Sequence, residues 1–190
     1  NALVQYADVL PTLMEAAGAK PDRHAYDGTS FLSVLLGKTS QHRRFVYGMH
    51  NNIPEGPPYP IRSISNGTYR YIRNLRPDEI YIEKHLMGWS GDGQLNNPYW
   101  ATWVREAWAN APTYDLVKRY MHRPPEQLYL TAQDPYEMMN RADDPTLNAI
   151  KMQLRTELER WMQTQGDPGA PQDSSKALKA SRRGKHLYGP

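Results

Sequence analysis

Residues 44–75 read RFVYGMHNNIPEGPPYPIRSISNGTYRYIRNL, and this stretch decides the fold. Within it, Asn66-Gly67 separates two runs, residues 61–65 and 68–73, whose side chains suit strands. An Asn-Gly pair accepts the positive φ angles that a tight turn requires. The two runs are therefore predicted to pair as an antiparallel hairpin.

Further strands are predicted at residues 45–49 and 127–131. Between the first of these and the hairpin, the prolines of NNIPEGPPYP exclude a central strand, because proline has no N–H to donate to a neighbouring strand. Apolar residues at helical spacing predict helices over residues 6–17, 30–36, 99–110, 113–121 and 146–165. This order of elements predicts an α+β fold, in which a small antiparallel sheet of about four strands is packed by the long C-terminal helix.

Composition narrows the possible functions. The chain has 190 residues, which suits one domain of ordinary size or one small domain with a tail. The absence of Cys excludes disulfides, cysteine-based zinc sites and a cysteine nucleophile within it. No run of about 18 apolar residues is present, so we expect no membrane partner. Because the chain begins without Met and inside an apolar pattern, we interpret it as part of a longer protein.

Much of the net charge of +3 comes from basic residues between positions 176 and 185. We expect a solvated, disordered tail there. Nucleic-acid binding is the weaker interpretation, because no aromatic stacking platform interleaves with these charges.

Candidate binding residues surround the proline-rich loop. His50 can donate a hydrogen bond to an anionic or hydroxylated ligand, and Asn51 offers both a donor and an acceptor. An ordinary polar turn is the alternative for this pair. Arg62, which begins a hairpin strand behind Pro60, can bind a carboxylate or a sulfate through two parallel hydrogen bonds. A surface arginine in a cross-strand ion pair is the alternative for Arg62.

No complete catalytic apparatus is visible in the sequence. The acids Asp78, Glu79, Glu83 and Asp92 do not have the spacing of a calcium loop. There is no H-E-x-x-H, no G-x-S-x-G, no Walker loop and no dinucleotide-binding fingerprint.

Three tryptophans share one predicted face of the helix at 99–110: Trp100, Trp103 and Trp108. At this spacing we expect them to pack in the core, and stacking on a sugar is the alternative.

Several motifs, taken in order, resemble those of type I sulfatases. They are YADVLPTL at 6–13, DGTSFL at 27–32, EQLY at 126–129 and DPYEMMN at 134–140. Two more, YPIRS at 59–63 and GDP at 166–168, are similar to the heparan N-sulfatase (sulfamidase) branch. One departure is Leu130-Thr131, where the family usually has Asp-Leu after E-L-Y.

The resemblance implies a domain organisation. Residues 1–40 would end an alkaline-phosphatase-like α/β domain, and residues 41–168 would form the C-terminal subdomain with its four-stranded sheet and packing helix. Residues 169–190 would be the basic, disordered tail.

The resemblance also implies a chemistry. The nucleophile of the family is a formylglycine made from Cys or Ser in a C/S-x-P-x-R motif, and the enzymes use calcium. That motif is absent here. We therefore expect the chain to supply neither a catalytic residue nor a metal ligand, and the missing N-terminal part to supply both formylglycine and calcium. His50, Asn51 and Arg62 are then the candidates for binding the sulfated sugar, which would resemble N-sulfoglucosamine.

The expected partners are a sulfated glycan and the missing N-terminal domain. By the same resemblance, the location is periplasmic, secreted or lysosome-like. The alternative function is a stand-alone carbohydrate- or partner-binding module. The two differ in one respect: a free module should bury Val9, Leu13 and Met14, whereas a part of a larger enzyme should leave them exposed.

Overall fold

The computed structural model describes residues 2–22, 24–52, 57–88, 97–170 and 176. The chain forms two compact units that are interleaved along the sequence. The first comprises Asn1–Gly48, Ser63–Tyr71 and Leu128–Leu154, and the second Met49–Arg62, Ile72–Gln127 and Arg155–Pro190. The family-based domain boundaries after residues 40 and 168 stay a prediction.

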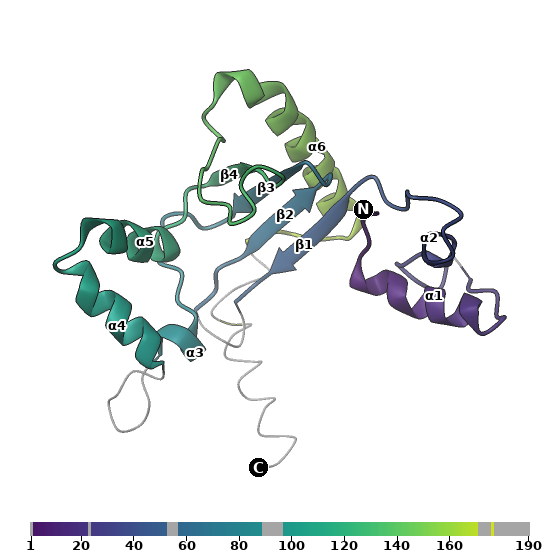
Figure 1. The fold of residues 1–190 in the computed structure, drawn as a ribbon, viewed down its shortest axis with the longest axis horizontal. Helices are drawn as coiled ribbons and strands as arrows, with labels where there is room; N and C mark the ends of the chain where they lie inside the picture. The colour runs from purple at the N-terminus through teal and green to yellow at the C-terminus, as the bar shows by residue number, and fades with distance from the viewer. Residues whose placement is uncertain (1, 23, 53–56, 89–96, 171–175, 177–190) are drawn as a thin grey trace, which may run out of the picture. The chain divides into compact units, whose positions relative to one another are not determined.

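Four strands form one antiparallel sheet in the order β1-β2-β3-β4 (Figure 1). Their bounds are β1 Val46–His50, β2 Ile61–Ser65, β3 Tyr69–Asn74 and β4 Glu126–Leu130. In the first unit, Ile64, Tyr71 and Leu128 are buried, one from each of three successive strands. The predicted α+β fold with a small antiparallel sheet is confirmed.

The hairpin between β2 and β3 is also confirmed, with a turn that differs from the prediction. Only Gly67 has a positive φ, of 89°, while Asn66 does not. The Asn66 side chain instead accepts hydrogen bonds from the backbone N–H groups of Thr68 (3.0 Å) and Tyr69 (2.8 Å). Glycine as the first central residue is the pattern of a type II′ turn. Asn66 therefore precedes the two central residues of the turn.

The helices follow the predicted positions closely. They are α1 Val9–Ala16, α2 Leu32–Leu35, α3 Lys84–Met87, α4 Pro98–Ala107, α5 Ala111–Met121 and α6 Asn148–Thr164, with 3-10 turns at Tyr6–Asp8 and Pro145–Leu147. Side chains that accept a backbone N–H precede three of these elements: Asn97, Asn110 and Asp144. Such residues satisfy donors that have no partner within the first turn. The short helix α3 has no counterpart among the predicted elements.

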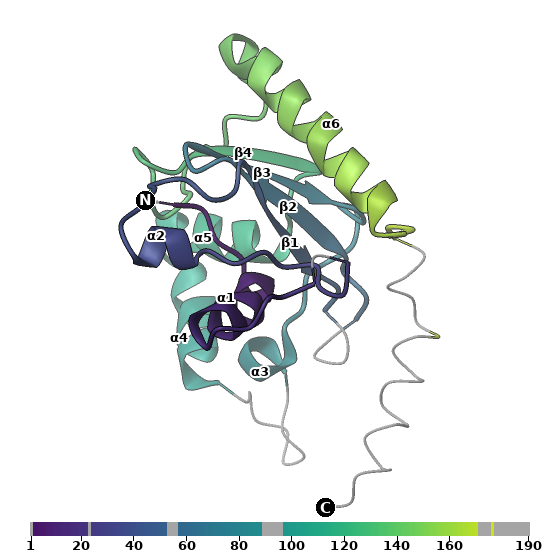
Figure 2. The same cartoon turned by 90° about the vertical axis from the view of Figure 1, so that its right-hand side faces the viewer.

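In the second unit, the C-terminal half of α6 lies beside the end of β3 and the start of β4 (Figure 2). Arg73 Nη1 donates to Glu159 Oε1 at 2.8 Å, and Arg155 pairs with Glu126 at 3.5 Å. Leu158 of the same half is fully buried. The predicted packing helix therefore meets the sheet through one apolar stripe bordered by ion pairs.

In the first unit, the N-terminal segment is held by a buried carboxylate. Asp8 has no exposed surface, and it accepts hydrogen bonds from the backbone N–H groups of Gln5 and Thr29, both at 2.9 Å. Arg43 donates to both of its oxygens, with Nε at 2.7 Å from Oδ2, and His42 Nε2 lies 3.2 Å from Oδ2. Burial opposes the charge on Asp8, but the hydrogen bonds from Arg43, Gln5 and Thr29 prevail and hold its pKa well below the ordinary value.

Gly28 makes this arrangement possible. A Cβ atom added there would lie 1.9 Å from the carbonyl oxygen of Ala7. Only glycine allows the backbone to approach so closely that the N–H of Thr29 reaches Asp8. Close packing therefore explains the glycine at position 28 in the motif at 27–32.

The first helix leaves apolar side chains exposed. Leu13 is 62% exposed, Leu10 53% and Val9 37%, and Leu35 and Leu36 of α2 are exposed as well. Met14 is half-buried. Val9 and Leu13 thus have the exposure expected of a part of a larger protein rather than of a free module.

We predict that Asp8→Asn destabilises the chain by roughly 3 kcal/mol at neutral pH, because it leaves the Arg43 guanidinium without its anionic partner. Folding lowers the pKa of Asp8. Its contribution to the free energy of unfolding is therefore complete above the unfolded pKa of about 4, and it declines as the pH falls below that value. Urea denaturation at pH 7 and pH 3 measures both effects, and the difference between variant and wild type should shrink at pH 3.

The matched control is Asp27→Asn, which changes an exposed carboxyl in the adjoining loop and should alter stability little. Equal effects of the two substitutions would contradict the role given to Asp8.

Candidate functional site

The predicted binding residues lie where β1 ends. His50 is the last residue of β1 and its side chain is exposed, while Asn51 is half-buried. Asn52 is buried in a left-handed conformation with φ 59°. Its Nδ2 donates to the carbonyl oxygens of Pro57 (2.7 Å) and Ile82 (2.9 Å). Asparagine tolerates this conformation better than most residues, and its amide joins the end of β1 to Pro57 and Ile82.

Arg62 is the most enclosed of the three candidates. Its side chain has no exposed surface, and Nε and Nη2 donate to the two carboxylate oxygens of Asp167 at 2.5 Å and 3.1 Å. Asp167 itself is 4% exposed. The hydrogen bonds from Arg62 lower the pKa of Asp167, although burial acts in the opposite direction. The guanidinium thus has a permanent anionic partner 105 positions later in the chain.

The remaining donors of Arg62 connect it to the other two candidates. Nη1 donates to Asn51 Oδ1 at 2.9 Å, to the backbone oxygen of Ile61 at 2.9 Å and to that of His50 at 3.4 Å. Because a guanidinium only donates, the amide oxygen of Asn51 must face it. Nδ2 of Asn51 is then the end of the amide that can donate to a ligand.

The structure therefore brings His50, Asn51 and Arg62 together, in a way that the sequence pattern does not reveal. Arg62 does not form a cross-strand ion pair at the surface. Its side chain is buried and pairs with Asp167, which lies in the GDP motif at 166–168. That motif is the one signal that could have suggested the pair. Direct contact of the three residues with a substrate stays a prediction.

A continuous row of rings extends from His50 through the second unit. Successive ring centroids lie 6.0 Å apart for His50 and Tyr81, 5.7 Å for Tyr81 and Tyr120, 5.5 Å for Tyr120 and Trp100, and 6.2 Å for Trp100 and Trp103. These five residues are called the aromatic row below. Tilted and edge-on contacts of this kind stabilise aromatic clusters beyond simple burial.

The expectation that all three tryptophans pack in the core is wrong for two of them. Trp100 is 4% exposed and belongs to the core, but Trp103 is 48% exposed and Trp108 is 90% exposed. Trp100 is buried because it lies on the face of α4 that packs against Tyr120 of α5. Trp108 caps the C-terminus of α4 rather than extending the buried stripe.

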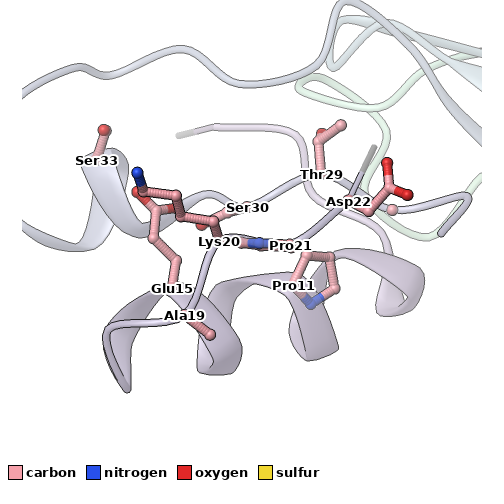
Figure 3. Close-up of a pocket in the computed structure, with 10 residues that line it drawn as sticks. Pro11, Glu15, Ala19, Lys20, Pro21, Asp22, Thr29, Ser30 and Ser33 are labelled. Carbon is pink, nitrogen blue, oxygen red and sulfur yellow. The ribbon is translucent and has the colours of Figure 1, made fainter. Parts of the chain in front are cut away.

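A separate pocket lies in the first unit (Figure 3). Its volume is about 370 Å³, and it is formed by α1 and the segment that follows it, with Glu15, Lys20, Asp22, Ser30 and Ser33 among its lining residues. Its two acids and single lysine do not favour an anion such as sulfate. None of the three predicted binding residues lines this pocket.

No metal centre is found in the described part of the chain, where no three His, Asp or Glu side chains gather as ligands. Glu83, one of the acids without calcium-loop spacing, accepts the backbone N–H groups of His85 and Leu86 at the start of α3. Asp92 lies outside the described residues. Among the described helices, none combines the length and the apolar character that crossing a membrane requires.

Comparisons with known proteins identify the family. No family model matches the chain. An ulvan-active sulfatase of Formosa agariphila is 34% identical over 169 residues, which cover 88% of this chain and 30% of that protein. A second ulvan-active sulfatase of the same organism is 26% identical over 176 residues, and the human N-sulphoglucosamine sulphohydrolase is 26% identical over 179 residues.

Solved structures share the fold. BT1596, a 2-O GAG sulfatase, superposes with a TM-score of 0.54 and 20% identity over 84% of this chain and 25% of that one. BT4656, solved in complex with its substrate D-glucosamine-2-N,6-O-disulfate, gives a TM-score of 0.51 with 16% identity over 85% and 24%.

The chain spans about a third or less of the length of the curated relatives it matches. The matches nevertheless extend over most of this chain, and the predicted relationship is confirmed. The chain belongs to the sulfatase family.

Proposed function

We propose that this chain is the C-terminal part of a sulfatase that removes sulfate from a sulfated sugar of the N-sulfoglucosamine type. The main support is the 34% identity over 169 residues to an ulvan-active sulfatase. The relation to the human N-sulphoglucosamine sulphohydrolase, together with the YPIRS and GDP motifs, favours an amino sugar as the substrate.

In this proposal the nucleophile and the metal lie in the rest of the enzyme. The residues described here do not fit a calcium site, because no three ligands gather and the carboxylates of Asp8 and Asp167 are occupied by arginines. The sequence also lacks the motif from which formylglycine is made. Calcium and formylglycine are therefore assigned to the part that this chain does not represent.

This chain contributes one side of the substrate-binding site, formed by His50 and Asn51. His50 and the Nδ2 group of Asn51 are donors suited to sulfate or hydroxyl oxygens. Arg62 acts on the substrate through Asn51, since its guanidinium holds the amide oxygen and turns the amide nitrogen outward. Asp167 largely balances the positive charge of Arg62. This side of the site therefore binds the substrate through directed hydrogen bonds more than through net charge.

The remainder of the sulfatase is the proposed partner of the exposed apolar side chains on α1 and α2. Leu10, Leu13 and Leu35 are each more than half exposed, which suits a surface covered by another part of the same protein. A stand-alone module receives less support, because it would gain nothing from this exposure. A periplasmic, secreted or lysosome-like location accompanies the proposal.

We predict that the 190-residue chain alone does not hydrolyse N-sulfoglucosamine or an aryl sulfate, because it lacks both the nucleophile and the metal. Sulfate release measured by ion chromatography tests this, with a complete sulfatase as the positive control. Turnover at an enzyme-like rate by the chain alone would refute the proposal.

In a complete sulfatase that contains this chain, we predict that Asn51→Ala raises KM about tenfold and changes kcat little. One lost hydrogen bond to a charged ligand corresponds to such a factor. Steady-state kinetics with N-sulfoglucosamine measure both constants. The matched control is Asn148→Ala, an exposed asparagine at the start of α6, which should leave KM unchanged.

We also predict that Asp167→Asn raises KM by a similar factor, because Arg62 no longer holds Asn51 in place, and lowers stability by about 3 kcal/mol, because a buried guanidinium loses its counter-ion. The double variant Asn51→Ala/Asp167→Asn shows whether Asp167 affects KM by positioning Asn51 or by a general loss of structure. Its KM should equal that of Asn51→Ala alone, since the two residues act on one interaction. If the increases in KM of the two single variants multiplied in the double variant, Asp167 would not act through Asn51.

A further inference from the structure

The hairpin of α4 and α5 exposes an unusual set of side chains. Tyr99 is 72% exposed and Trp103 is 48% exposed, and the two lie four residues apart on α4. Residues at this spacing are neighbours on a helix surface. In both views α4 and α5 lie next to each other (Figures 1 and 2). The Tyr99–Trp103 pair therefore forms an aromatic patch on the side of α4 that α5 leaves open.

This patch is joined to the candidate binding residues by the aromatic row. Trp103 contacts Trp100 in a tilted arrangement, and the row continues through Tyr120 and Tyr81 to His50. Trp100 is 4% exposed, Tyr81 is 7% exposed and Tyr120 is half-buried, while His50 and Trp103 at the two ends of the row are exposed. All five residues belong to the second unit. The row thus links the patch to His50 through successive ring contacts.

Positive charge accompanies the row. The Arg123 guanidinium lies 4.1 Å from the centroid of the Tyr81 ring and 5.5 Å from that of Tyr120. Residues 98–123 also contain Arg105, Lys118 and Arg119, which makes four cationic side chains against two acidic ones, Glu106 and Asp115. A surface that combines exposed aromatic rings with an excess of positive charge suits a ligand that is both ring-shaped and anionic.

We propose that Tyr99 and Trp103, with Arg123, bind a stretch of sulfated polysaccharide that continues from the sugar at His50. The apolar faces of sugar rings pack on the two aromatic side chains, and sulfate groups lie towards Arg123. This inference rests on the proposed function and extends it, because it makes the substrate a polymer or oligosaccharide rather than a single sugar. A second copy of the chain or another protein on the same patch is an alternative that the experiment distinguishes.

The test is made on a complete sulfatase that contains this chain, with a heparin-derived hexasaccharide and N-sulfoglucosamine as probes. Trp103→Ala should weaken hexasaccharide binding, measured by isothermal titration calorimetry, about tenfold, as for a central aromatic contact. Binding of N-sulfoglucosamine should not change. Trp103→Tyr keeps a ring at the position and should retain most of the hexasaccharide affinity, which separates lost stacking from lost folding.

The matched control is Trp108→Ala, which removes a more exposed tryptophan five residues further along, outside the Tyr99–Trp103 pair. It should leave both affinities unchanged. Arg123→Gln should weaken hexasaccharide binding more at low salt than at high salt, because screening reduces the contribution of the charge. Unsulfated dextran should not bind to any of the proteins.

Three results would overturn the inference: an unchanged hexasaccharide affinity in Trp103→Ala, an equal loss in Trp108→Ala, or a change from dimer to monomer in Trp103→Ala by sedimentation velocity. The last would assign the patch to contact between copies. Failure of the proposed function is a separate result, since it would appear as an absence of sulfate release from N-sulfoglucosamine by the unmodified enzyme. Normal release with an unaffected hexasaccharide affinity would reject this inference alone.

Discussion

The buried pair of Arg62 and Asp167 is the constraint on which the second unit depends. A guanidinium without exposed surface is tolerated only where a carboxylate and further acceptors surround it. The chain must therefore return after α6 to place Asp167 against β2. The same guanidinium donates to Asn51 and to the backbone oxygen of His50, so one arginine holds both the C-terminal segment and the end of β1 against β2. The Arg62–Asp167 pair therefore both stabilises the second unit and positions the residues of the candidate site.

The first unit is built on the same chemistry. Asp8 collects donors from Gln5, Thr29 and Arg43, and Gly28 gives the backbone the room to approach it. Both arginine-bound carboxylates lie in motifs that resemble those of sulfatases. These two motifs thus contain residues that hold the backbone in place.

Local patterns predicted local structure well. The Asn66-Gly67 hairpin and the stripe of α6 follow from turn chemistry and helical periodicity, which involve neighbouring residues only. Contacts across the chain were not predictable in the same way. Arg62 and Asp167 are 105 positions apart, and nothing in the sequence around Arg62 distinguishes a buried partner from a bound ligand. The exposure of Trp103 was missed because periodicity shows which residues share a face but not how much of that face a neighbouring helix covers.

The left-handed Asn52 has a consequence for redesign. Its amide nitrogen donates to two carbonyl groups, that of Pro57 and that of Ile82 beyond β3, and so joins the end of β1 to two segments that come later in the chain. A designer who changes the sequence between β1 and β2 should therefore keep this asparagine. Replacing Asn52 would remove the donor to both carbonyl groups at once, and would place a residue that tolerates a positive φ less well directly after β1.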